Sequence, residues 1–197
     1  MGFVKPNKTL KHHKVALLIV DMLNTFDFPE RKKLTKFAEP VAENILRLKN
    51  RLAKRNVPII YLNDNFGRWK SDRNEIFQIC TEQGCIGKTV AEILEPTPSD
   101  YFILKPRHSG FYCTNLDILL EDLGVEKLII TGVAGNICVF FTVNDAHMRD
   151  YKIWVPKDTV ASNTKKDNQY ALDQMKSVLG VSIRDSSEGL ENFLEKR

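Results

Sequence analysis

Cys138 lies where a nucleophile could be built. It belongs to a glycine-containing turn that follows a hydrophobic run at 127–130 and leads into a stretch with helical spacing. The beginning of a helix presents unpaired N–H groups and the positive end of the helix dipole, and both favour a thiolate over a thiol. The sequence therefore predicts a nucleophilic cysteine thiolate at this turn.

Two other hydrophobic runs end in groups that such a nucleophile needs. Asp21 follows the run at 15–20, and Lys105 follows the run at 101–104. A cation stabilises a thiolate, and a carboxylate accepts and returns its proton. Taken singly, each residue has a simpler explanation, as a buried small side chain, a turn former or a solvated lysine. The occurrence of all three at strand ends favours catalysis.

Strands and helices alternate along the chain. The sequence predicts strands at 14–20, 57–62, 101–104, 127–131, 151–155 and 181–184 and helices at 39–55, 115–123, 137–149 and 165–179, with a short last helix at 190–194. This order predicts one three-layer α/β/α domain over residues 1–197, with a six-stranded, mostly parallel sheet. Ligands bind such sheets at the carboxyl ends of the strands, where the three candidate residues gather.

The composition excludes several classes of function. The 197 residues carry a net charge of +4, spread among 25 acidic side chains, so nucleic-acid binding has little support. No apolar run approaches the ~18 residues of a membrane span. The four cysteines lack further ligands at the spacing of a zinc site and fit free thiols. We expect a soluble, cytoplasmic protein that acts on a small molecule.

Four segments together resemble the isochorismatase-like cysteine hydrolases, which include nicotinamidases and N-carbamoylsarcosine amidohydrolase. They are Leu18-Ile19-Val20-Asp21-Met22-Leu23-Asn24-Thr25-Phe26, Lys105-Pro106-Arg107-His108-Ser109-Gly110-Phe111, Thr131-Gly132-Val133-Ala134-Gly135-Asn136-Ile137-Cys138-Val139 and Asn144-Asp145-Ala146-His147-Met148-Arg149-Asp150-Tyr151. The resemblance spans nearly the whole domain in the expected order. It implies the isochorismatase-like, Rossmann-like fold and an assembly of two or four subunits.

The resemblance also implies roles for single residues. It makes Asp21, Lys105 and Cys138 a catalytic triad. It places a cis peptide bond between Val133 and Ala134, so that the backbone N–H groups of Ala134 and Cys138 form an oxyanion hole. His108, beside the lysine motif, is expected behind the site or at the surface.

The sequence departs from parts of the family pattern. Metal-containing nicotinamidases have an Asp-x-His after the second strand, whereas this chain has Asn63-Asp64-Asn65 and no histidine between residues 14 and 107. We therefore expect no metal and no other cofactor. Residues of this region and of the first two motifs are expected to form the pocket wall: Phe26, Asn63, Asp64, Trp69 and Phe111. A polar turn with a packed tryptophan explains 63–69 equally well.

Three functions follow from these observations. The first is a cysteine hydrolase that cleaves a small amide or carbamoyl compound through a thioester on Cys138. The second is hydrolysis of an isochorismate-like vinyl ether with Asp21 as the acid, a reaction that needs no thiol. The third is a binding or redox-responsive protein in which Cys138 is an oxidisable thiol.

The segment 63–100 is the one long stretch that we predict to be irregular. Its prolines and glycines favour a loop that covers the substrate. It also contains several large apolar residues, Phe66, Trp69, Ile76, Phe77 and Ile79, and such surface is covered either by the protein's own pocket or by a second subunit. We predict a homodimer with this segment near the interface.

Overall fold

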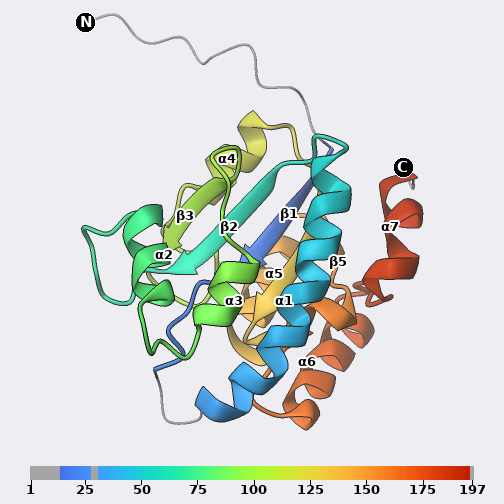
Figure 1. Ribbon diagram of the computed structural model, residues 1–197. Helices are drawn as coiled ribbons and strands as arrows, with labels where there is room; N and C mark the ends of the chain where they lie inside the picture. The colour runs from blue at the N-terminus through green and yellow to red at the C-terminus, as the bar shows by residue number, and fades with distance from the viewer. Residues whose placement is uncertain (1–13, 28–30, 196–197) are drawn as a thin grey trace, which may run out of the picture.

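A six-stranded parallel sheet forms the centre of the protein (Figure 1). The computed structural model describes residues 14–27 and 31–195. Five strands follow one another in the order β3-β2-β1-β4-β5, and β6 pairs with β4. Their bounds are β1 (Val15–Val20), β2 (Ile59–Asp64), β3 (Tyr101–Lys105), β4 (Lys127–Val133), β5 (Lys152–Trp154) and β6 (Val160–Ala161).

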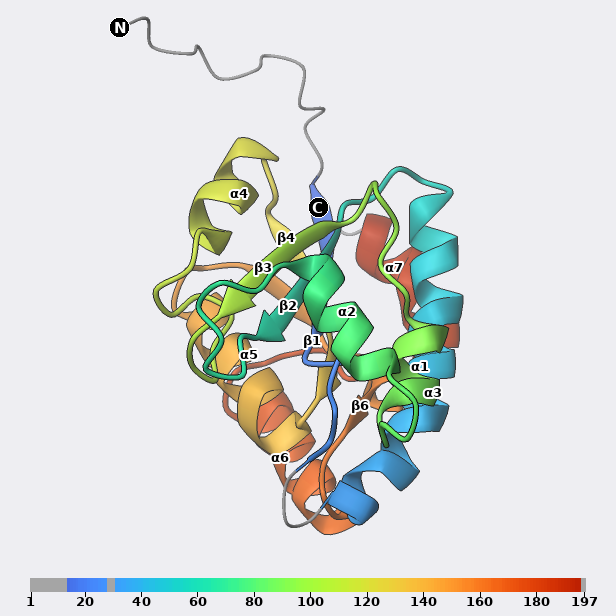
Figure 2. The same ribbon diagram turned by 60° about the vertical axis from the view of Figure 1, so that its left-hand side comes forward.

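Helices cover both faces of this sheet, so the predicted three-layer α/β/α fold is confirmed (Figures 1 and 2). One face packs against α1 (Arg31–Ala53), α3 (Lys88–Ile93) and α7 (Ser186–Glu195). The other packs against α4 (Leu116–Asp122), α5 (Phe140–His147) and α6 (Lys165–Ser177). The short helix α2 (Arg73–Thr81), the π-helical turn η1 (Gly135–Val139) and the 3-10 turn η2 (Lys157–Thr159) complete the described elements.

The sequence of the central strand β1 is continuously apolar because both faces of the strand are buried. All six of its side chains are buried. Successive side chains of a strand point to opposite faces of the sheet. Accordingly, Leu17 and Ile19 belong to the core under α1, whereas Leu18 and Val20 belong to the core under α4, α5 and α6. A strand buried on both sides holds its carboxyl end, and hence Asp21, in a fixed place.

Helix α1 begins at Arg31, eight residues before the predicted start at residue 39. The apolar face continues toward the N-terminus through Leu34, Ala38 and Val41, whose spacing keeps them on one side of the helix. Pro40 lies inside the helix on its exposed side. The proline does not interrupt the packing of the helix, because the buried stripe passes it on the opposite side.

The segment 63–100 contains two helices and a small core, which corrects the prediction of an irregular loop. Asp72 caps α2, since its Oδ1 accepts hydrogen bonds from the N–H groups of Asn74 and Glu75 at 2.8 and 2.9 Å. Ile76 and Cys80 of α2 pack with Leu23 and Ala91. Much of the apolar surface of this segment is therefore buried within the chain itself.

The sixth strand is not the predicted one at 181–184. In that segment Ser182 alone forms a bridge, to Trp154 at the end of β5. The sixth strand is instead β6, two residues long, which pairs with Gly132 and Val133 of β4. This pairing places the residues after β6 beside the turn that carries Cys138.

No helix within the described ranges is long and apolar enough to cross a membrane.

Candidate active site

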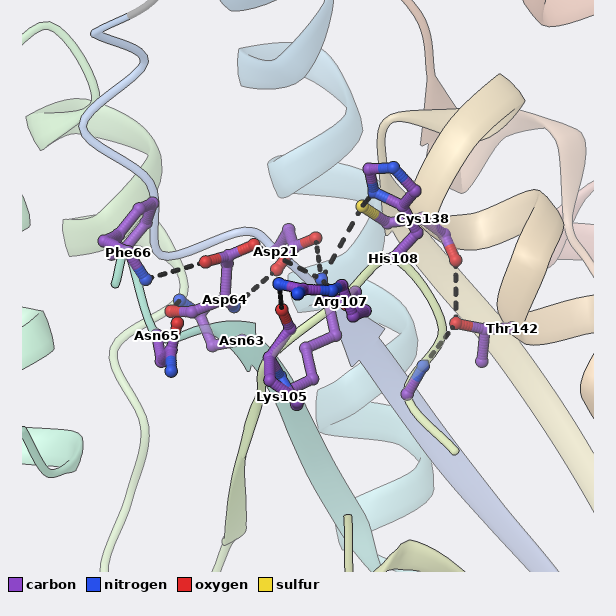
Figure 3. A network of polar contacts seen from close by, with 12 residues as sticks. Asp21, Asn63, Asp64, Asn65, Phe66, Lys105, Arg107, His108, Cys138 and Thr142 are labelled. Atoms are coloured by element: carbon purple, nitrogen blue, oxygen red, sulfur yellow. Dashed lines mark hydrogen bonds and ion pairs between the residues drawn. The ribbon is translucent and has the colours of Figure 1, made fainter. Parts of the chain in front are cut away.

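The ends of β1, β3 and β4 bring three predicted residues into contact (Figure 3). The Nζ of Lys105 lies 2.8 Å from Oδ2 of Asp21 and 3.6 Å from Sγ of Cys138. Asp21 and Lys105 are buried, and Cys138 is partly buried. Residues more than a hundred positions apart in the chain thus form one compact polar cluster, in which the ammonium group links the carboxylate and the sulfur.

Backbone groups fix the carboxylate of Asp21. Its N–H donates to the carbonyl of Leu62 at 2.9 Å, and its Oδ1 accepts from the N–H of Asp64 at 2.7 Å. Its φ of 50° lies in the left-handed region, which aspartate enters more readily than most residues. The chain therefore turns sharply after β1, and the side chain points toward Lys105.

Lys105 is an ammonium group with all three donors in use. Besides Asp21 and Cys138, its Nζ donates to the carbonyl of Arg107 at 3.1 Å. Burial alone would lower the pKa of this amine, but the negative charge of Asp21, with a smaller contribution from the sulfur of Cys138, outweighs burial and raises the pKa above its ordinary value. A permanent positive charge therefore lies beneath the sulfur.

Burial and two charged neighbours act on the pKa of the Cys138 thiol. Burial raises the pKa of the Cys138 thiol, the carboxylate of Asp21 raises it further, and Lys105 offsets only part of this. Burial also raises the pKa of Asp21 despite Lys105. A carboxylate with a raised pKa is a stronger base. These surroundings therefore favour the thiol form of Cys138, and the neighbouring carboxylate of Asp21 is suited to accept its proton during attack.

A tight turn carries the thiol. The peptide bond between Val133 and Ala134 is cis. The N–H groups of Ile137 and Val139 both donate to the carbonyl of Ala134, at 3.0 and 3.2 Å. In the part of the chain that the structure describes, the N–H groups of Ala134 and Cys138 have no hydrogen-bond acceptor outside this turn. Their role as an oxyanion hole stays a prediction.

Residues after β6 hold this turn from behind. The Oγ of Ser162 accepts from the N–H of Asn136 at 3.1 Å and donates to Oδ1 of Asn168 at 3.0 Å. A Cβ at Gly135 would lie 2.5 Å from that Oδ1 and 2.9 Å from the serine Oγ. Only glycine lets β6 and α6 approach the turn this closely.

The cluster opens into a cavity of about 430 Å³. Its lining comes from the ends of β1, β2 and β4, from the loops beside the sheet, from the first turns of α1 and from η1: Asp21, Asn24, Thr25, Asp27, Leu34, Asp64, Phe66, His108, Val133, Ala134, Ile137, Cys138 and Asn163. A cavity of this size holds a small molecule.

One of the five predicted wall residues, Asp64, lines this cavity. Phe26 and Phe111 are instead buried in the two main cores. Asn63 is buried too, and its side-chain amide bonds the backbone of the segment after β1. Trp69 is 79% exposed and lies outside the cavity lining. The three predicted aromatic residues thus lie in the core or at the surface and not at the cavity wall.

His108 lies closer to the thiol than predicted. Its Nδ1 is 3.9 Å from Sγ of Cys138, and its ring lies 5.5 Å from that of Phe141. It is exposed and lines the cavity. The other lining residues that the sequence did not indicate are Asn24, Thr25, Asp27, Leu34, Phe66, Ile137 and Asn163. Thr25 and Ile137 stand in the recognised motifs, and their position beside Asp21 and Cys138 was the available signal.

Within residues 14–27 and 31–195, no group of three or more His, Cys, Asp or Glu side chains is placed to hold a metal ion. Metal independence stays a prediction. Elemental analysis of the purified protein tests it, and stoichiometric metal that is lost together with activity on chelation would contradict it.

A model of the isochorismatase domain matches residues 15–186. The chain belongs to the isochorismatase family. It is 46% identical to the uncharacterized isochorismatase family protein YaaI of Bacillus subtilis (strain 168), over 89% of this chain and 96% of that protein. It is also 30% identical over 167 residues to an isochorismatase of the same strain, covering 82% of this chain and 52% of the relative.

Two solved structures connect this family fold with amide hydrolysis. N-carbamoylsarcosine amidase from Thermoplasma acidophilum superposes with a TM-score of 0.69 at 28% identity, over 89% of this chain and 98% of that one. The nicotinamidase SaPncA from Staphylococcus aureus superposes with a TM-score of 0.66 at 29% identity, over 88% and 98%. The family therefore includes hydrolases that act on amide C–N bonds.

Proposed function

We propose that this protein is a cysteine hydrolase that cleaves a small amide or carbamoyl compound through a thioester on Cys138. One observation carries the proposal: Sγ of Cys138 lies 3.6 Å from Nζ of Lys105, which is 2.8 Å from Asp21, at the wall of a cavity that fits a small molecule. This arrangement combines a nucleophile, a base and a fixed positive charge.

In the first half of the reaction, the Cys138 thiol transfers its proton to Asp21 while the sulfur attacks the carbonyl carbon. Lys105 stabilises the negative charge on sulfur as the proton leaves. The N–H groups of Ala134 and Cys138 hold the oxyanion, an interaction worth about 3–4 kcal/mol per donor in other hydrolases. The oxyanion then collapses and the C–N bond breaks. Asp21 returns its proton to the departing nitrogen, which leaves as ammonia or an amine.

In the second half, water hydrolyses the thioester. Asp21, again a carboxylate, takes a proton from the attacking water. The C–S bond breaks, the sulfur receives the proton, and the acid leaves. The raised pKa of Asp21 suits both steps, because a stronger base takes the first proton and still releases it to the leaving nitrogen.

Intact-mass measurement after acid quench tests the proposal on a panel of small amides, ureas and carbamoyl compounds. We expect an acyl adduct on Cys138 and ammonia or amine release that is lost in Cys138→Ala. Cys113→Ala is the matched control, since Cys113 is exposed and outside the cavity lining. Full turnover by Cys138→Ala would refute the proposal.

The same variants separate the alternatives. A relative of the chain is named isochorismatase, and turnover of isochorismate that survives Cys138→Ala would favour vinyl-ether hydrolysis with Asp21 as the acid. If Cys138 alkylates with an ordinary thiol pH profile that Lys105→Ala leaves unchanged, the protein is better described as binding or redox-responsive.

A further inference from the structure

His108 reaches the sulfur of Cys138 from the cavity. Its Nδ1 lies 3.9 Å from Sγ in a hydrogen-bond contact, and Figure 3 shows the imidazole beside the thiol. The ring also packs against Phe141, at 5.5 Å between the two centroids. The histidine is exposed and lines the cavity, whereas Asp21, the other basic group at the sulfur, is buried. The thiol therefore has two basic groups within reach, one in the buried cluster and one on the solvent-facing side.

The chain on both sides of His108 is fixed to the same cluster. The carbonyl of Arg107, directly before it, accepts from the buried ammonium at 3.1 Å. The N–H of Gly110 donates to Oγ1 of Thr142 at 3.0 Å, and this hydroxyl donates to the carbonyl of Cys138 at 2.7 Å. These bonds tie the segment of the histidine to the turn of the cysteine, so the imidazole is held at the sulfur although it is exposed.

The imidazole is a group whose charge ordinarily changes near neutral pH. Lysine and arginine stay charged between about pH 5 and 8, and histidine titrates in that range. Burial raises the pKa of Asp21 toward the same range, so the titration of this carboxyl has to be separated from that of the histidine. The charged side chains around the imidazole, among the described residues, come from the end of β3, the loop after it and the cavity wall: Lys105, Arg107, Asp21, Asp27 and Asp64.

We infer that His108 is a second proton acceptor for Cys138, placed on the solvent-facing side of the sulfur. In this step the S–H bond breaks, the sulfur keeps the electron pair, and Nδ1 takes the proton. The imidazolium that forms then donates a charge-assisted hydrogen bond to the thiolate. This inference rests on the proposed function, since it adds a base for the nucleophile of the same site. His108 is then a catalytic residue in direct contact with the reacting sulfur.

Such an acceptor changes how the reactivity of the thiol depends on pH. The thiolate of an isolated thiol increases about tenfold for each pH unit below its pKa. A thiolate beside an imidazolium has as many protons as a thiol beside a neutral imidazole, so the share of this ion pair stays constant once the imidazole is neutral. The rate of alkylation therefore becomes flat above the titration of the imidazole, and it rises again when thiolate beside neutral histidine predominates.

Iodoacetamide, a neutral reagent, tests the inference in the Asp21→Asn protein, where the carboxylate no longer takes the proton. Rates at Cys138 are measured by peptide mass between about pH 5 and 9. We expect a flat region about one pH unit wide, the effect of a full charge next to a partly buried thiol. Adding His108→Gln should restore an unbroken rise, with the rate about tenfold lower at about pH 5.5 and unchanged at about pH 8.

Two single variants complete the test. His108→Gln alone, at an exposed position, should slow alkylation of the otherwise unaltered protein more at about pH 5.5 than at about pH 8, and this comparison does not require Asp21→Asn to fold. His147→Gln replaces an exposed histidine outside this cavity lining and should change nothing.

A steady rise in Asp21→Asn, a flat region that survives the added His108→Gln, or an effect of His108→Gln that is equal at every pH would overturn the inference. Because alkylation needs no substrate, these results do not depend on whether the protein hydrolyses amides.

Discussion

At the scale of residues, two neighbours shift the pKa of the Cys138 thiol in opposite directions. The carboxylate of Asp21 raises the pKa of the thiol, and the ammonium of Lys105 lowers it, with burial as the largest influence. Below the pKa, each unit by which it falls gives ten times more thiolate. The two neighbours are therefore distinguishable by how fast the thiol reacts with a neutral reagent.

We predict that Asp21→Asn alkylates faster at Cys138 than the unaltered protein and that Lys105→Met alkylates more slowly, each by about threefold or more. The asparagine removes a charge that opposes the thiolate, and the methionine removes one that supports it. Iodoacetamide rates between about pH 7 and 9, read by mass, provide the test. Circular dichroism checks that Lys105→Met still folds with Asp21 uncompensated. The reverse order of rates would contradict the charge assignment.

The sequence predicted the cluster of Asp21, Lys105 and Cys138 better than the residues around it. Asp21 and Lys105 each end a buried strand, so the sheet itself specifies where they lie. Asp27, His108 and Asn163 come from loops between elements, and their approach to the cavity depends on how those loops fold back. A pattern of apolar residues holds no information about how loops fold, which is why four of the five predicted wall residues lie outside the cavity lining.

At the scale of elements, one glycine lets β1 and β4 meet beside the site. Gly132 has a φ of 114°, and a Cβ there would lie 2.1 Å from the carbonyl oxygen of Val20. We predict that Gly132→Ala destabilises the protein by about 3 kcal/mol or more, since backbone must move. Gly180→Ala is the matched control, with φ 66° but open space around it, and should cost about 1–2 kcal/mol. Urea unfolding measures the free energy of unfolding of both variants. Equal losses of stability in the two would contradict the steric argument.

A buried ion pair joins α1 to the chain before β3. The Nζ of Lys49 lies 2.7 Å from Oδ2 of Asp100, with both side chains buried, and 2.9 Å from the hydroxyl of Tyr61. We predict that Asp100→Ala destabilises the protein by about 3–5 kcal/mol, because it leaves a buried ammonium without its partner. Glu191→Ala breaks an exposed ion pair with Arg55 and should shift the urea midpoint little. Similar shifts in the two variants would contradict the prediction.

Element type followed from the sequence more reliably than element length. Continuous apolar runs predicted β1 to β5 to within about two residues, because strands buried on both faces need such runs. The two-residue strand β6 has no pattern of its own, since it is defined by its pairing with Gly132 and Val133. Residues 181–184 alternate in polarity but do not form a strand, because only Ser182 pairs with a neighbouring strand.

At the scale of the whole molecule, the surface retains large apolar side chains in the segment 63–100. Ile76 and Cys80 are buried in a small core of their own, which removes part of the argument for a subunit interface. Phe66, Trp69 and Ile86 nevertheless stay exposed. Exposed apolar groups that lie near one another in the chain favour a contact with another molecule. The homodimer stays a prediction, now based on these three residues.

Light scattering of the purified protein at micromolar concentration tests that prediction. A dimer would have about twice the 22.6 kDa of one chain. Trp69, which is 79% exposed, should contribute most, so Trp69→Asp is expected to shift the mass toward the monomer. Val178→Asp alters a similarly exposed apolar residue at the end of α6 and should leave the mass unchanged. A monodisperse species near 22.6 kDa before any substitution would refute a stable oligomer, and the exposed tryptophan would then need another partner.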